Sequence, residues 1–92
     1  MKATRYNIKA CCGKTNIIFK TDATITNNTL QSLVKLGFIE SEHFTKAGIL
    51  YVDNSDFIVT APIGSNRLEV KCKKNDCNQK INEFEELFPL LE

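Results

Sequence analysis

Alternation of apolar and polar residues predicts a hairpin at the start of the chain. Within Arg5–Cys11, every second residue from Tyr6 to Ala10 is apolar, which is the period-two pattern of a half-buried strand. A short β-rich run covers Asn16–Lys20, and the turn candidate at Gly13 lies between the two segments. We therefore expect the first two strands to pair as a hairpin, with two adjacent cysteines near its tip.

Three further strands are expected in the second half of the chain. The apolar-rich segments Gly48–Asp53 and Phe57–Ala61 flank the polar turn Asn54-Ser55, which predicts a second hairpin. In Arg67–Cys72 the even-numbered residues are apolar or cysteine, and the odd-numbered residues are charged. This register places Cys72 on the core side of the strand.

Capping residues mark out a first helix. Thr26 is a good N-cap, because its hydroxyl can accept a hydrogen bond from an amide of the first turn. Gly37 can end the helix in the left-handed conformation, which would let Phe38 fold back on Leu33.

A second helix completes the predicted fold. Asp76 is its expected N-cap, apolar residues recur at helical spacing from Ile81 to Leu91, and Pro89 should end the regular helix near Phe88. The predicted order is ββαβββα. We expect an α+β fold in which a small antiparallel sheet of about five strands packs one face on two helices.

The composition indicates one small domain covering residues 1–92. Its 42% apolar and 25% charged residues are ordinary for a globular protein, and no apolar run is long enough for a membrane span. A chain of this size is marginally stable and is often supported by a metal, a disulfide or a second subunit. The N-terminal residues lack a secretory pattern, so we expect a cytoplasmic protein.

The cysteines are the main candidates for chemistry. They form two close pairs almost sixty residues apart in sequence: Cys11 and Cys12, and Cys72 and Cys77. If the fold brings the pairs together, four thiolates could hold one tetrahedral zinc ion. Against this, the first pair lacks the usual two-residue spacer. Partial burial as plain thiols and a redox role, through a vicinal or a Cys72–Cys77 disulfide, therefore stay open as alternatives.

Lysines gather in the same segments as the cysteines and suggest nucleic-acid binding as an alternative function. The candidates for contact with phosphates are Lys9, Lys14, Lys20, Lys71, Lys73 and Lys74. Tyr6, Phe19 or Tyr51 would stack bases on an open sheet face. However, the net charge is only +1, and a lysine-rich strand face is commonly just solvated.

Nothing in the sequence indicates catalysis, so we expect no enzyme. His43 is expected in a loop, without a recognisable nucleophile or orienting partner. The four glycines are not clustered, which argues against a phosphate-binding loop. The three nearby glutamates of the final helix are expected to form its solvated side.

Three segments carry a resemblance to a known group of proteins. Ala10–Phe19, Phe44–Val52 and Gly64–Leu68 resemble short uncharacterised proteins of marine tailed phages, including cyanophages. The resemblance implies a phage accessory protein in the host cytoplasm, and it assigns no functional residue. We therefore expect a protein-interaction module that binds a host or phage protein, with zinc as an optional brace. A homodimer through an exposed strand edge is a further alternative.

Overall fold

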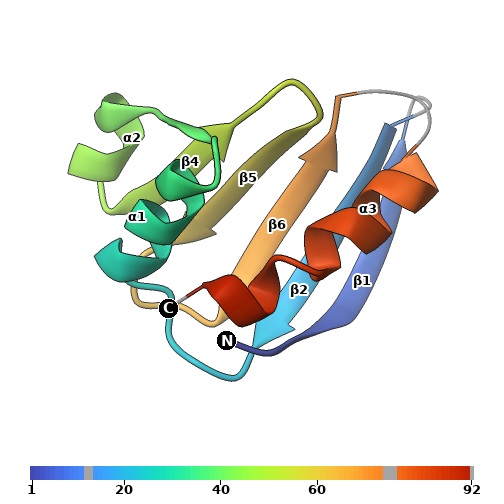
Figure 1. Cartoon of the computed structure of the whole chain (residues 1–92), viewed down its shortest axis with the longest axis horizontal. Coiled ribbons are helices and arrows are strands. Elements are labelled where there is room, and N and C mark those ends of the chain that lie inside the picture. The colour runs from blue at the N-terminus through green and yellow to red at the C-terminus, as the bar shows by residue number, and fades with distance from the viewer. Residues whose placement is uncertain (12–13, 74–76, 92) are drawn as a thin grey trace.

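A computed structural model describes residues 1–11, 14–73 and 77–91, and within these ranges the side chains of residues 6–11, 14–15 and 77–78 lie outside the description. Within the described residues the fold is α+β, as the sequence predicts. One antiparallel sheet of six strands has the order β1-β2-β6-β5-β4-β3 (Figure 1).

The elements follow the chain in the order ββαβαβββα. The strands are β1 (Ala3–Cys11), β2 (Lys14–Thr21), β3 (Ile39–Glu40), β4 (Ile49–Asp53), β5 (Phe57–Pro62) and β6 (Arg67–Cys72). The helices are α1 (Asn27–Lys35), α2 (Glu42–Lys46) and α3 (Cys77–Glu85), followed by a 3₁₀ turn at Phe88–Leu90. Both predicted hairpins, β1–β2 and β4–β5, are confirmed.

Helices α1 and α3 cover one face of the sheet and enclose the core (Figure 1). The predicted alternation of β6 is confirmed, because Leu68, Val70 and Cys72 are buried in this core. Phe84 of α3 lies at its centre and is 1% exposed. Its ring centroid lies 5.4 Å from those of both Phe57 and Phe88, so α3 is anchored to the sheet by aromatic packing.

The end of α1 follows the predicted capping pattern. Gly37 has a φ of +104°, and its amide donates to the carbonyl of Val34 at 3.1 Å. The Phe38 amide donates to the carbonyl of Leu33 at 3.2 Å, which completes a Schellman motif. Phe38 and Leu33 are both buried in the core, so the turn directs the chain from α1 into β3.

Two short elements were not predicted, and the strand and helix counts were therefore too low. The segment expected to be a loop around His43 contains β3 and α2, so the loop assignment of His43 was wrong. A two-residue strand and a five-residue helix are too short to show a period. The regular part of α3 also ends at Glu85, before the predicted position near Phe88, and Pro89 lies in the 3₁₀ turn.

The two ends of the described chain lie side by side at one end of the molecule (Figure 1). The N-terminal ammonium group of Met1 donates to the carbonyl of Leu91 at 3.1 Å. Along α3, the Arg5 guanidinium of β1 bonds the Glu85 carboxylate, and it also donates to Asn82 Oδ1 at 2.8 Å. The last helix is therefore fixed to the first strand as well as to the core.

Candidate functional site

The ends of the elements that carry the cysteines converge at one end of the molecule. The last residue of β1 is Cys11, the last of β6 is Cys72, and the first of α3 is Cys77. These three element ends lie together, opposite the end where the termini meet (Figure 1). Cys12 lies outside the described residues.

Cys72 is the one predicted metal ligand whose side chain is described. It is 4% exposed and faces the core, and its sulfur is part of a disulfide bond. A disulfide sulfur is not a thiolate, so Cys72 could bind zinc only after reduction. The alternative in which Cys72 is a plain buried thiol therefore does not hold in this structure.

The sheet register separates Cys72 from Cys11. Asn16 of β2 lies opposite Lys71 of β6, and Cys11 of β1 lies opposite Lys14 of β2. Strand β2 therefore lies between the two cysteines. With two strand spacings and a one-residue offset, their Cα atoms are roughly 10 Å apart, which is too far for a direct disulfide.

The described residues contain no group of three or more histidine, cysteine, aspartate or glutamate side chains arranged to hold a metal. The predicted four-cysteine zinc site includes three cysteine side chains that lie outside this description. The site therefore stays a prediction, supported by the convergence of the element ends.

The sheet face opposite α1 and α3, which we call the open face, is the second candidate site. Strand alternation directs one set of side chains to this face, and α2 packs on β4 from the same side. Its described members are Thr4, Asn16, Ile18, Lys20, Ile39, Ile49, Tyr51, Asp53, Ile58, Thr60, Pro62, Arg67, Glu69 and Lys71.

An aromatic cluster lies at the β4 side of the open face. The ring of Phe44, from α2, stacks on Tyr51 of β4 with centroids 4.6 Å apart and an interplanar angle of 13°. His43 meets Phe44 edge-on at 5.7 Å. Phe44 is 39% exposed, and Ile39 of the adjacent edge strand is 69% exposed. This corner of the face thus presents apolar surface to solvent.

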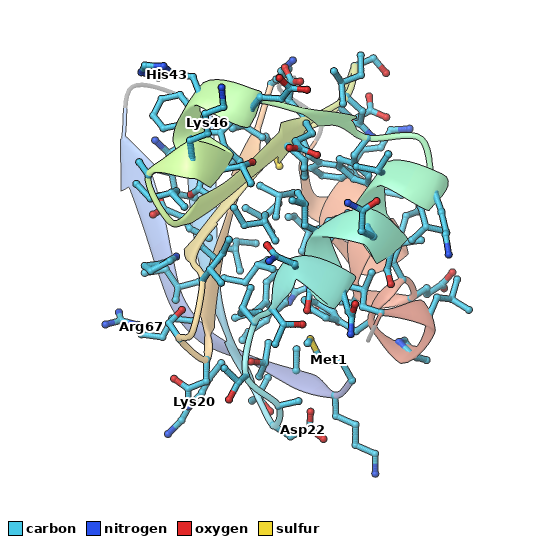
Figure 2. All side chains as sticks on the ribbon, turned by 90° about the vertical axis from the view of Figure 1, so that its left-hand side faces the viewer. Met1, Lys20, Asp22, His43, Lys46 and Arg67 are labelled. Carbon is cyan, nitrogen blue, oxygen red and sulfur yellow. The ribbon has the colours of Figure 1, made fainter. Side chains whose placement is uncertain are left out.

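Cations lie at the other side of the open face. Lys20 of β2 is directly opposite Arg67 of β6, and both side chains are exposed. Figure 2 shows both projecting away from α1 and α3. Lys71 is also exposed on this face, two residues from Glu69. An anionic group bound near the exposed Lys20 would be stabilised by its charge.

The other predicted phosphate contacts are less well placed. Lys73 Nζ is 2.9 Å from Asp53 Oδ2, so its charge is already paired. The side chains of Lys9 and Lys14 lie outside the described set, as does all of Lys74. The nucleic-acid hypothesis therefore keeps Lys20 and Lys71 as exposed candidates.

The base-stacking prediction was wrong for Phe19. Its side chain is fully buried against α3, with the Phe88 centroid 4.9 Å away. Tyr51 does lie on the open face, but one side of its ring is covered by Phe44. The Tyr6 side chain lies outside the described set.

Two hollows lie on the surface of the described part of the chain. One, of about 210 Å³, is lined by Ile18, Pro62, Ser65, Arg67 and Glu69. Another, of about 260 Å³, is lined by Lys2, Thr4, Lys20, Thr21 and Asp22. Both are smaller than a typical small-molecule site. In the first hollow the Ser65 hydroxyl donates to the carbonyl of Pro62 at 2.7 Å. His43 lies at the other end of the molecule and is therefore not placed to act on this hydroxyl (Figure 2).

Sequence reasoning missed three residues of the open face. Arg67 was counted as a charge but was not assigned to a site, because the pairing of β2 with β6 cannot be read from the sequence. Ile39 and Phe44 were missed because they lie in the two short elements. Their large apolar side chains in a polar segment were the available signal.

No helix in the described part of the chain is long and apolar enough to cross a membrane. Comparisons with protein-family models, with curated proteins and with solved structures find no match to this chain. The functional argument therefore depends on the geometry of this chain alone.

Proposed function

We propose that this protein is a non-catalytic protein-interaction module that binds its partner on the open face. One observation carries the proposal: α1 and α3 cover one face of the sheet, while the opposite face exposes Phe44 and Ile39 at its β4 side and cations at its β2–β6 side. Single exposed apolar residues are common on protein surfaces. Here they share one face with Tyr51, and aromatic residues and arginine are enriched in protein interfaces.

The aromatic cluster is suited to protein binding because it is held in place. Stacking on Tyr51 restricts the Phe44 ring, and the edge of His43 restricts it further. A side chain that is already ordered loses less conformational entropy when a partner covers it. Arg67 and Lys20 on the same face can select a partner that carries carboxylates.

The open face supports a protein partner better than a nucleic acid. Single-stranded binders use aromatic rings whose faces are free to stack on bases. In this protein the Tyr51 ring is already stacked on Phe44, and the exposed aliphatic side chain of Ile39 offers no such ring. The nucleic-acid alternative predicts oligonucleotide binding that weakens steeply with salt.

Site-specific photo-crosslinking tests the proposal. A photoreactive amino acid replaces Phe44 in one variant, and in the matched control it replaces Glu86, which is exposed on the helix-covered side after α3. We expect a discrete crosslinked protein at position 44 only. Excess wild-type protein, added as a competitor, should prevent this crosslink, whereas excess Phe44→Asp protein should not. Equal crosslinking at both positions, or crosslinking mainly to nucleic acid, would contradict the proposal.

We further propose that the module is a phage accessory protein that acts in the host cytoplasm. The support is the resemblance of Ala10–Phe19, Phe44–Val52 and Gly64–Leu68 to proteins of marine tailed phages. Fractionation of infected host cells tests this placement. Recovery of the protein in the membrane or extracellular fraction would contradict it.

A second candidate function is a cysteine-based redox switch, and the disulfide at Cys72 is the specific observation that favours it. Its buried sulfur lies at the junction of β6 and the segment leading into α3, so reduction would change how this helix is tethered. Alkylation followed by intact mass measurement counts free thiols before and after treatment with a dithiol reductant. Four free thiols in protein isolated under acid quench would exclude this switch.

Zinc binding remains part of the proposal for the reduced protein. The four candidate ligands are Cys11, Cys12, Cys72 and Cys77. Native mass spectrometry of reduced protein with added zinc should show one bound ion per chain, and oxidised protein should bind none. An apo mass under both conditions would remove zinc from the proposal.

A further inference from the structure

We propose that the outer edge of β1 binds an extended, acidic segment of a partner protein as an additional antiparallel strand. This inference rests on the proposed function only in requiring a protein partner. It concerns a different surface from the open face, and it names the chemistry of the segment that binds there.

The backbone of β1 provides the hydrogen-bonding groups. At nine residues it is the longest strand of the described sheet, and it lies at one edge. Within the described chain, only β2 pairs with it. An unpaired strand edge presents a row of amides and carbonyls that an extended peptide can match.

The direction of individual amides follows from the start of β1. The Lys2 amide donates to Asp22 Oδ1 at 2.8 Å, and the Lys2 carbonyl accepts from the Asp22 amide at 3.0 Å. Lys2 therefore turns both backbone groups toward the β2 side. Because these directions alternate along an antiparallel strand, the amides of Ala3 and Arg5 face the outer side.

The charge of this segment selects the partner. Residues 1–20 carry five cationic side chains and no acidic one, and three of the five, Lys2, Arg5 and Lys9, lie on or beside β1. Glu85 already pairs with Arg5, and the exposed Lys2 adds a further cation at the start of the strand. A strand that carries carboxylates at alternate positions matches this edge, whereas a cationic strand is repelled.

The same charges argue against a second copy of this chain as the occupant. Pairing of two copies through this edge would bring together two strands whose charged residues are all cations. Like charges on neighbouring strands destabilise such a pair. The register irregularity between Arg5 and Asn7 also reduces regular pairing with an identical strand.

The other edge of the sheet is less suitable. Strand β3 has only two residues, Ile39 and Glu40, and the chain turns into α2 directly after it. A two-residue edge offers too few backbone groups to hold a peptide, and Glu40 would oppose an acidic one. The long cationic edge of β1 is thus the better template for an added strand.

Peptide binding to the full-length protein tests the inference. The probe is a blocked eight-residue peptide of alternating valine and glutamate, labelled with a fluorophore. The controls are a peptide with lysine in place of glutamate, and an acidic peptide of equal charge with two prolines that prevent strand pairing. We expect saturable binding of the first peptide only, together with slower hydrogen exchange at the Arg5 amide.

Protein variants separate this site from the open face. Lys2→Glu combined with Lys9→Glu should weaken peptide binding by about tenfold or more, because two attractive charges become repulsive. Phe44→Asp should leave peptide binding unchanged, although as an excess competitor it should fail to prevent the crosslink at the open face. The inference fails if the proline peptide binds equally well, or if an oligothymidylate displaces the peptide at equal charge concentration. It also fails if the amide chemical-shift changes caused by the peptide, measured by NMR, centre on Phe44 and not on β1.

Discussion

Replacement of Phe84 by alanine should remove a large part of the stability of this domain. The side chain is 1% exposed and lies between α3 and the sheet, with four phenylalanine rings around it at centroid distances of 5.4–6.2 Å. Phenylalanine-to-alanine changes in a core cost about 3–5 kcal/mol. A chain of 92 residues has a total unfolding free energy of only about 5–14 kcal/mol.

Guanidinium denaturation followed by circular dichroism measures this loss. With about 4 kcal/mol removed, the midpoint should fall by roughly 1 M or more, and the thermal midpoint by roughly 15–30 °C. Phe84→Leu keeps most of the apolar volume and should fold with a loss of about 1 kcal/mol, so it covers the case in which the alanine variant does not fold.

Phe44→Ala is the matched control, because it deletes the same side chain at a position that is 39% exposed. It removes one stacking contact with Tyr51 and should cost about 1 kcal/mol. Equal losses for the two alanine variants would refute the placement of α3 on the sheet. They would also remove the basis for describing the opposite sheet face as open.

Three further predictions concern stability. Gly37→Ala should cost about 1 kcal/mol or more in urea denaturation because φ is +104°, and Gly37→Asn should recover part of the loss, since the site has open space for a side chain. A dithiol reductant should lower the unfolding free energy by about 2–4 kcal/mol, whereas Cys72→Ser protein should already be destabilised and insensitive to reductant. Raising sodium chloride to about 1 M should change the unfolding free energy by less than about 1 kcal/mol. The ion pair between Lys73 and Asp53 is exposed, so it contributes little that salt could screen.

The fold class and most elements could be predicted because their signals are local. The alternation in β6 requires one buried face, so the burial of Leu68 and Val70 follows directly from their spacing. Gly37 and Phe38 form the predicted Schellman motif because the preference of glycine for positive φ does not depend on the rest of the fold. Prediction failed at His43, where β3 and α2 contain too few residues to show a period.

The candidate sites could be predicted only in part, because they depend on which strands pair. The segments that carry the cysteines and lysines were identified from the sequence, but the pairing of β2 with β6 was not. That pairing brings Lys20 opposite Arg67, and it also places β2 between Cys11 and Cys72. The pairing of β2 with β6 therefore has two consequences: it creates the basic site, and it prevents a direct disulfide between Cys11 and Cys72.

Helix α3 physically connects the cysteine-bearing end of the molecule to the edge of β1. The helix begins five residues after the disulfide-bonded Cys72, and near its other end Glu85 and Asn82 bond Arg5 of β1. Phe84 fixes the intervening turns to the core, so displacement of the helix start works against this aromatic packing. A redox change at Cys72 can therefore alter the β1 edge only if it also weakens the packing of Phe84. If α3 stays docked in both redox states, the cysteines and the strand edge act independently. The two proposed activities would then belong to separate surfaces of one small domain.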